Sequence, residues 1–278
     1  MVTGTVTRCI CLARAAVHVL GAAVRIFIVF PWLTASQQRA QIQHWSAKAL
    51  VIFGLRVAPA RSGVRIETRP CLYIANHVSW LDVIAIWATT DTLFVAKSEV
   101  AHWPVFGRLA QSLGVIFIER TRRADALTAG RTVAAELARG RSVCIFPEGT
   151  TTEGRELQPF RTALFQSAID ARVPIQPLAL RYFRADATRA AEAAFTGDMS
   201  LVQSMWQLSA SGPLTIDIGF LISIASAGQD RRTLARQAQD LIAARLQAPG
   251  PAVARLPVRI ADAHVERNFA TEPADLPA

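Results

Sequence analysis

Short apolar runs alternate with longer amphipathic segments along most of the chain. Because buried strands are short and continuously apolar, the runs predict strands, at residues 71–75, 93–96, 115–118, 142–146, 174–180 and 215–222. The remaining periodic segments predict helices, at residues 83–89, 100–112, 124–139, 160–171 and 229–247. This alternation predicts an α/β fold with a mixed, partly parallel central sheet flanked by helices.

An apolar segment at residues 15–33 is almost long enough to span a bilayer. Arg25 falls near its middle, where a charge costs about 2.5 to 3.5 kcal/mol on insertion scales. On a helix, Arg14, His18, Gly21 and Arg25 share one stripe, which favours a helix lying in the headgroup layer. A cleaved signal peptide is disfavoured because no small-residue cleavage site follows.

A second helix is expected after Pro31, with Ser36 as its N-cap and with apolar side chains at helical spacing up to Ile52. The sequence therefore predicts an N-terminal pair of amphipathic membrane-associating helices. For the second helix, the alternative that it completes the core of the main domain stays open.

The pattern divides the chain of 278 residues into one large domain with appended ends. Residues 1–58 hold the membrane-associating helices, and residues 59–248 form the expected catalytic domain. Residues 249–278 are rich in Pro and Ala without sustained periodicity, which predicts a loosely ordered tail.

Composition narrows the classes of partner. Hydrophobic residues make up 51% and charged residues 18%, a balance between soluble domains and multi-span membrane proteins. The formal charge of +9 suits an anionic membrane surface or a phosphorylated ligand. Nucleic acid is not expected as a partner, because no helix-turn-helix, zinc-finger or ribonucleoprotein signature is present. The four cysteines lack the paired spacing of a zinc site, so no metal site is predicted.

Candidate chemistry follows the first predicted strand, in the run NHVSWLD at residues 76–82. It places His77 and Asp82 at a strand end, where open α/β sheets bind their ligands. A continuous helix would hold these two side chains about 140° apart, so the chain must turn for them to meet. Ser79 is expected to supply that turn as an N-cap. From these residues alone, a capping pair beside an ordinary loop histidine is the favoured interpretation.

Four ordered blocks decide between these interpretations: NHVSWLD at 76–82, GVIFIER at 114–120, FPEGT at 146–150 and VPIQPLAL at 173–180. Together they resemble the glycerolipid acyltransferases of the lysophosphatidic acid acyltransferase type. The resemblance implies transfer of an acyl chain from acyl-CoA or acyl-carrier protein to the hydroxyl of a lysolipid, without a further cofactor. His77 would be the general base, and Asp82 would fix its tautomer and stabilise the imidazolium.

The resemblance also implies the residues that bind the acceptor. Arg120, in the second block, would bind its phosphate, since a guanidinium suits that group. Glu148, Gly149 and Thr150 form a turn beside the first block, where Glu148 would orient Arg120 or accept a hydrogen bond from the acceptor hydroxyl. Without the resemblance, Arg120 could equally be a solvated arginine and Glu148 an ordinary turn residue.

The expected acceptor is 1-acyl-glycerol-3-phosphate, and the product phosphatidic acid. Many members that make phosphatidic acid carry an arginine directly after the Glu-Gly-Thr turn, whereas this chain has Thr151 and Thr152. That departure keeps lyso-ornithine lipid as an alternative acceptor, because bacterial acyltransferases for that lipid share the pattern. The enzyme is expected at the cytoplasmic face of a bacterial inner membrane, as a monotopic protein or with a single N-terminal anchor. Alternatives of other classes are a non-catalytic membrane-bound scaffold and a hydrolase that activates water.

Overall fold

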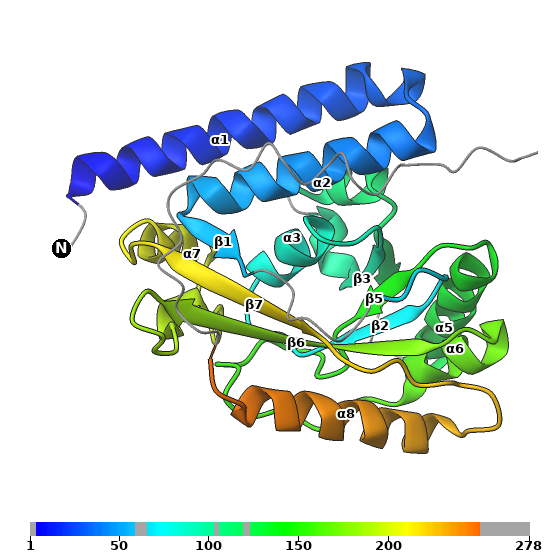
Figure 1. Cartoon of the computed structure of the whole chain (residues 1–278). Helices are drawn as coiled ribbons and strands as arrows, with labels where there is room; N and C mark the ends of the chain where they lie inside the picture. Colours follow the sequence, from blue (N-terminus) through cyan, green and yellow to red (C-terminus); the bar gives the residue numbers. More distant parts are fainter. Residues whose placement is uncertain (1–3, 59–65, 103–105, 119–122, 251–278) are drawn as a thin grey trace, which may run out of the picture.

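A computed structural model describes residues 4–58, 66–102, 106–118 and 123–250. Figure 1 shows a central twisted sheet with helices packed on both of its faces. Most of the predicted C-terminal tail, from residue 251 onward, lies outside the described residues.

The sheet is mixed, as predicted. In the described residues it has seven strands in the order β1-β7-β6-β2-β5-β3-β4. All neighbouring strands are parallel except β6 and β7, which are antiparallel. The strands are β1 (Leu55–Val57), β2 (Leu72–Ala75), β3 (Leu93–Lys97), β4 (Ile116–Ile118), β5 (Val143–Ile145), β6 (Ile175–Arg184) and β7 (Leu214–Phe220).

The six predicted strands are all present, and β1 is an addition that the pattern did not separate from the preceding helix. The α-helices are α1 (Thr5–Ile28), α2 (Ala35–Ile52), α3 (Leu81–Trp87), α4 (Phe106–Ser112), α5 (Arg123–Ala138), α6 (Gln166–Ala171), α7 (Leu201–Leu208) and α8 (Arg231–Gln247). Short 3-10 helices are η1 (Phe30–Trp32), η2 (Ser98–His102), η3 (Ala163–Phe165) and η4 (Ala191–Ala193). Helix α7 was not predicted, although Ser200 and Gln203 form a capping box at its start.

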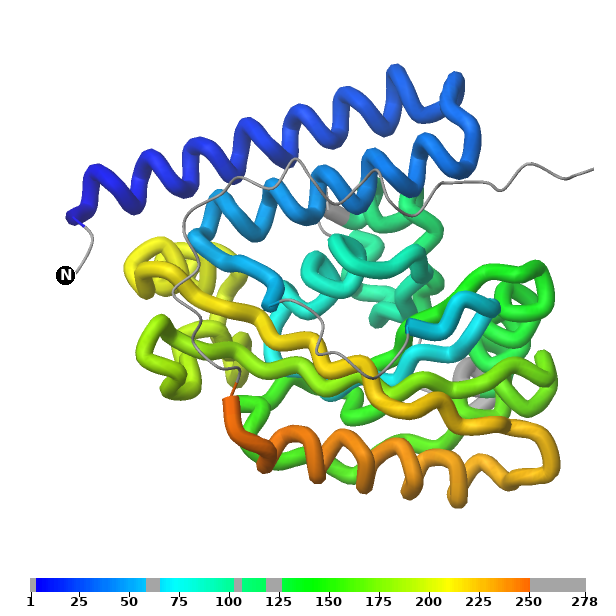
Figure 2. Tube along the Cα trace, viewed as in Figure 1, coloured from blue at the N-terminus to red at the C-terminus, as the bar shows by residue number. Residues whose placement is uncertain are grey.

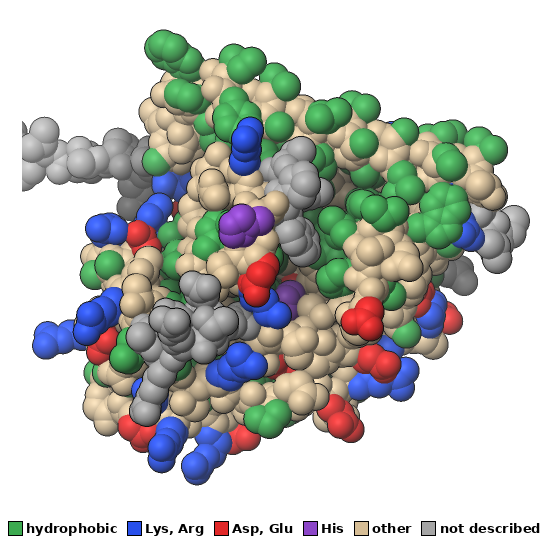
Figure 3. Space-filling model, turned by 180° about the vertical axis from the view of Figure 1, so that it is seen from behind, with side chains coloured by type: hydrophobic (Ala, Val, Ile, Leu, Met, Phe, Trp, Pro, Cys, Tyr) green, Lys and Arg blue, Asp and Glu red, His purple; other side chains and the backbone are tan. Residues whose placement is uncertain are grey.

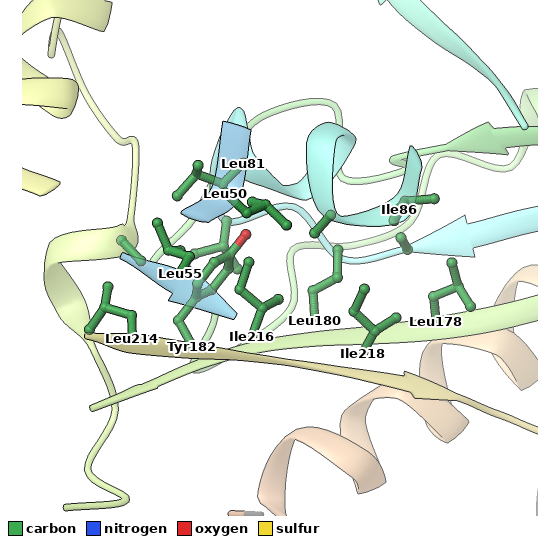
Figure 4. Packing of buried hydrophobic residues seen from close by; sticks show 14 of the residues in the cluster. Leu50, Leu55, Leu81, Ile86, Leu178, Leu180, Tyr182, Leu214, Ile216 and Ile218 are labelled. Atoms are coloured by element: carbon green, nitrogen blue, oxygen red, sulfur yellow. The ribbon is translucent and has the colours of Figure 1, made fainter. Parts of the chain in front are cut away.

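Two apolar clusters hold the layers together, one on each face of the sheet. On the first face α2, α3 and α7 pack against β1, β2, β6 and β7, and this cluster contains the residues in Figure 4. On the second face α5, α6 and α8 cover β2, β4, β5 and β6. Every strand in the middle of the sheet is therefore buried on both faces, which is why the strands read as continuous apolar runs.

Helices α1 and α2 run side by side along one edge of the molecule (Figures 1 and 2). Two residues of the predicted polar stripe of α1, His18 and Arg25, contact α2, whereas Arg14 and Gly21 are exposed. His18 stacks on Trp45 with ring centroids 4.8 Å apart, and Arg25 Nη1 donates to Gln41 Oε1 over 3.1 Å. These two polar side chains are thereby paired within the hairpin.

The opposite side of α1 is apolar and exposed, and it carries Val17, Leu20, Val24 and Phe27. Seen from behind, hydrophobic side chains gather along this upper edge, whereas charged side chains lie over the lower half (Figure 3). By length and composition alone, α1 could cross a membrane.

Helix α2 is the inner member of the hairpin. It begins after Thr34, which forms a capping box with Gln37, so the predicted cap at Ser36 is wrong by two residues. Ala49 and Leu50 are buried, and Leu50 belongs to the apolar cluster of the first face. The alternative that the second helix completes the core therefore holds.

Candidate active site

The turn that follows β2 is held by hydrogen bonds from two distant parts of the chain, residues 148–152 and Phe195. Glu148 Oε1 accepts from the His77 amide at 2.7 Å, and the His77 carbonyl accepts from the Thr152 amide at 2.8 Å. The Val78 carbonyl accepts from the Phe195 amide at 2.9 Å. A turn whose backbone groups are all paired has one geometry, so the side chain of His77 leaves it in a defined direction.

His77 and Asp82 meet as the sequence predicted. His77 Nδ1 lies 2.8 Å from Asp82 Oδ2, and the Asp82 side chain is 0% exposed. An ionised carboxylate only accepts hydrogen bonds, so Nδ1 carries the proton and Nε2, on the other edge of the ring, carries the lone pair. The ring is 21% exposed, so a group outside the protein can approach it. The pair is therefore arranged as a general base with its orienting acid.

The predicted cap at Ser79 is wrong. Helix α3 begins at Leu81 without a side-chain cap, and the Ser79 hydroxyl is buried without a partner among the described residues. Asp82 reaches back instead, and its Oδ2 accepts from the amides of Val78 at 2.6 Å and Ser79 at 2.9 Å. A carboxylate is the stronger acceptor for the free amides at a helix start, so it displaces the hydroxyl from this role.

The aromatic side chain of Phe146, at the end of β5, forms one wall of the site. It stacks on the His77 ring with centroids 3.9 Å apart and planes at 13°. Phe94, from β3, stacks in turn on Phe146 at 5.9 Å. Together these rings hold the imidazole in its plane and exclude water from one of its faces.

Glu148 lies beside His77, yet its two oxygens serve the backbone. Oε1 accepts from the His77 amide at 2.7 Å and Oε2 from the Gln158 amide at 2.9 Å, and the residue is 4% exposed. Burial raises the pKa of Glu148, while these two hydrogen bonds and the nearby His77 act in the opposite direction. In this arrangement Glu148 positions the turn, and its contact with an acceptor hydroxyl stays a prediction.

Of the other predicted binding residues, the structure describes Gly149 and Thr150 but not Arg120. Gly149 adopts a positive φ of 77° in the turn after β5, and its amide donates to the Phe146 carbonyl at 3.1 Å. Thr150 follows and is exposed. Arg120 lies outside the described residues, so its pairing with Glu148 or with phosphate stays a prediction.

The residues after the turn are also tied to the protein. Thr151 Oγ1 donates to the Phe195 carbonyl, and the Thr152 amide donates to the His77 carbonyl. The two arginines that follow in the sequence, Arg155 and Arg161, are instead exposed to solvent. The side chain of Arg155 lies 3.8 Å from that of Glu153. In the part of the chain that the structure describes, no His, Cys, Asp and Glu side chains gather in threes that could hold a metal ion.

Two residues near the pair were missed by the sequence analysis. Tyr182 donates its hydroxyl to Asp82 Oδ1 at 2.5 Å, and the amide side chain of Asn76 binds the backbone of Leu180. Tyr182 lies two residues beyond the predicted end of strand β6, after Arg181, so the local signal for it was weak. Its partner, 100 residues earlier, carries no pattern that links the two.

The chain is similar to known proteins over much of its length. A profile of the Acyltransferase family matches residues 57–181. The 1-acyl-sn-glycerol-3-phosphate acyltransferase of Neisseria gonorrhoeae is 39% identical over 174 residues, which are 62% of this chain and 68% of the relative. The lyso-ornithine lipid O-acyltransferase of Pseudomonas aeruginosa is 41% identical over 174 residues, 63% of this chain and 67% of the relative.

A lyso-ornithine lipid O-acyltransferase of Rhizobium meliloti aligns over more of the chain, with 33% identity over 228 residues, 78% of this chain and 76% of the relative. The crystal structure of the 1-acyl-sn-glycerophosphate acyltransferase PlsC from Thermotoga maritima shares the fold, with a TM-score of 0.61 at 18% identity. That superposition covers 86% of this chain and 96% of the other. With its His77–Asp82 pair and these relatives, the chain belongs to the Acyltransferase family.

Proposed function

We propose that this protein is a membrane-associated O-acyltransferase that acylates the free hydroxyl of 1-acyl-glycerol-3-phosphate, forming phosphatidic acid. Acyl-CoA or acyl-carrier protein serves as the donor. The observation that carries the proposal is the 2.8 Å contact between His77 Nδ1 and the buried carboxylate of Asp82, which leaves Nε2 as the proton acceptor of a partly exposed ring.

The reaction needs one proton to move twice. Nε2 of His77 takes the hydroxyl proton of the acceptor while that oxygen attacks the thioester carbonyl, and a carbon–oxygen bond forms. The carbon–sulfur bond then breaks, and the leaving thiolate receives the proton from the imidazolium. Asp82 stabilises the imidazolium between these two steps. Acyl chain and proton are thus both accounted for without a covalent acyl-enzyme.

The outer face of α1 supports a membrane location. Val17, Leu20, Val24 and Phe27 are each more than half exposed, and burial of such a side chain is worth about 1.5 to 3 kcal/mol. Several of them together outweigh the loss of freedom on binding a surface. The cytoplasmic face is the side on which acyl-CoA and acyl-carrier protein are available.

A second candidate acceptor is lyso-ornithine lipid, which has no phosphate. The residues after the Glu-Gly-Thr turn favour this acceptor. Thr151 donates to the carbonyl of Phe195 and Thr152 to that of His77, so these groups are already paired within the protein. No arginine stands there to contact a phosphate, and such charge-assisted hydrogen bonds are worth about 1.5 to 3 kcal/mol. For the phosphate acceptor, Arg120 would have to supply the contact.

One experiment separates these candidates. Purified protein in mixed micelles is given a labelled acyl thioester and, in parallel reactions, lysophosphatidic acid or lyso-ornithine lipid. We expect labelled phosphatidic acid from the first reaction, and turnover of lyso-ornithine lipid alone would assign the second acceptor. His77→Ala should lower either rate by about 10² to 10⁴. An equally active His77→Ala protein would exclude the proposed base.

A further inference from the structure

A buried tyrosine contacts the acidic member of the catalytic pair. Tyr182 lies on β6 and is 3% exposed, within the apolar cluster of the first face. In Figure 4 its ring stands between leucine and isoleucine side chains, with the hydroxyl oxygen at the end that points away from β6. A polar group in such a place is costly unless it has a partner, and the partner here is Asp82 Oδ1 at 2.5 Å.

The two oxygens of Asp82 have different partners. Oδ2 accepts from His77 Nδ1 and from the amides of Val78 and Ser79. Oδ1 accepts from the Tyr182 hydroxyl. Because Asp82 is 0% exposed, water cannot replace a missing donor at Oδ1. The phenol hydroxyl therefore fixes the rotation of the Asp82 carboxylate. It also competes with the imidazole for the negative charge of that carboxylate.

The side chain of Asn76 extends the pairing of β2 with β6 and so brings Tyr182 next to Asp82. Strand β2 ends at Ala75, which pairs with Leu178 of β6. Beyond that point Asn76 continues the ladder, since its Nδ2 donates to the Leu180 carbonyl at 3.0 Å and its Oδ1 accepts from the Leu180 amide at 2.7 Å. Tyr182 is two residues farther along, so its side chain lies on the same face of the strand as Leu180.

From these contacts we propose that Tyr182 is a positioning residue for the His77–Asp82 pair. It holds the carboxylate so that Oδ2 faces Nδ1, and it moderates the negative charge that Asp82 presents to the imidazolium. Because its ring is buried, it would act through Asp82. The proposal rests on the proposed function, because its kinetic effect is read in acyl transfer.

The test compares phenylalanine at the two tyrosines of the chain. Tyr182→Phe keeps the ring and removes the donor to Asp82. Tyr73→Phe is the matched control, since Tyr73 is also buried in the same cluster and its hydroxyl interacts with Cys71 instead. Because the carboxylate is then no longer held with Oδ2 facing Nδ1, we expect Tyr182→Phe to lower kcat by about tenfold, with KM for donor and acceptor almost unchanged. Tyr73→Phe should keep the parent rate.

The pH profile gives a readout that a structural role would not move. With one donor fewer, Asp82 directs more charge toward the imidazolium, which favours the protonated ring. The acidic limb of the kcat/KM profile should therefore move to higher pH in Tyr182→Phe and stay in place in Tyr73→Phe. A folded Tyr182→Phe protein with parental kcat and an unmoved acidic limb would overturn the proposal.

Two further measurements keep the proposal separate from folding and from the proposed function. If Tyr182→Phe does not fold, a fluorinated tyrosine at position 182 keeps the shape and donates more strongly, and the acidic limb should then move to lower pH. If the parent protein transfers no acyl chain to either acceptor, the proposed function fails. The nitrogen resonances of the His77 ring still test Tyr182 in that case, and identical titration curves in parent and Tyr182→Phe would refute the positioning role.

Discussion

Replacing Asp82 with asparagine should separate catalysis from folding. The amides of Val78 and Ser79 lie 2.6 and 2.9 Å from Oδ2 and require an acceptor, so the amide oxygen of the asparagine should take the Oδ2 position. Its NH₂ group then replaces Oδ1 beside the Tyr182 hydroxyl, whose oxygen can accept. His77 keeps its proton on Nδ1, and what is lost is the negative charge.

The magnitude follows from the contact between the two groups. A charge pair about 4 Å apart near a protein surface is worth about 4 kcal/mol, and a charge-assisted hydrogen bond exceeds a neutral one by roughly 1 to 1.5 kcal/mol. We expect about 2 to 4 kcal/mol of imidazolium stabilisation to be lost, which lowers kcat roughly 30- to 1,000-fold. KM should change little, because the charge acts on the ring that is protonated during the reaction.

The assay is release of free thiol from an acyl thioester in mixed micelles, with thermal unfolding measured on the same samples. Asp198→Asn, on an exposed residue, is the matched control and should keep the parent rate. Asp82→Ala should instead unfold more readily, because it leaves two buried amides without an acceptor at about 1 to 3 kcal/mol each. A folded Asp82→Asn protein within threefold of the parent kcat would refute the orienting role of Asp82.

Three further predictions concern the surroundings of the pair and the membrane surface. Because burial raises the pKa of Glu148, the folded state binds that proton more tightly, and stability should fall as pH rises through the raised pKa. Glu148→Gln removes this titration, so its denaturation midpoint should fall less than that of the parent as the pH rises above 4.5, the ordinary glutamate pKa, and parallel profiles would contradict the assignment. Gly154 has a φ of 71°, and a Cβ there would lie 2.6 Å from Val78 Cγ2. Gly154→Ala should therefore cost about 1 to 3 kcal/mol in a denaturant titration, and an unchanged midpoint would be inconsistent with that clash. Leu20→Glu combined with Phe27→Glu should weaken co-sedimentation with anionic vesicles at least tenfold, whereas unchanged binding would show that the outer face of α1 does not meet lipid.

The order and type of the main elements could be predicted because their signals are local. Each buried strand is a short apolar run bounded by polar residues, so β2 to β7 were found within a few residues of their bounds. The same holds for His77 and Asp82, which are five residues apart and directly follow a strand. Strand β1 was missed because it has only three residues and follows a helix closely. Helix α7 was missed although its eight residues are amphipathic and begin with a capping box, so its local signal was present and overlooked.

Tertiary structure alone decided which distant groups complete the site. Glu148 reaches the His77 amide across 71 residues, and Tyr182 reaches Asp82 across 100. It also decided that Asp82, and not Ser79, receives the amides at the start of α3. Such contacts depend on which strands become neighbours and in which register they pair. The pattern of polar and apolar residues along the chain specifies neither. The sequence by itself determined which side chains form the proposed catalytic pair, and the packing of β5 and β6 against β2 determined how they are held.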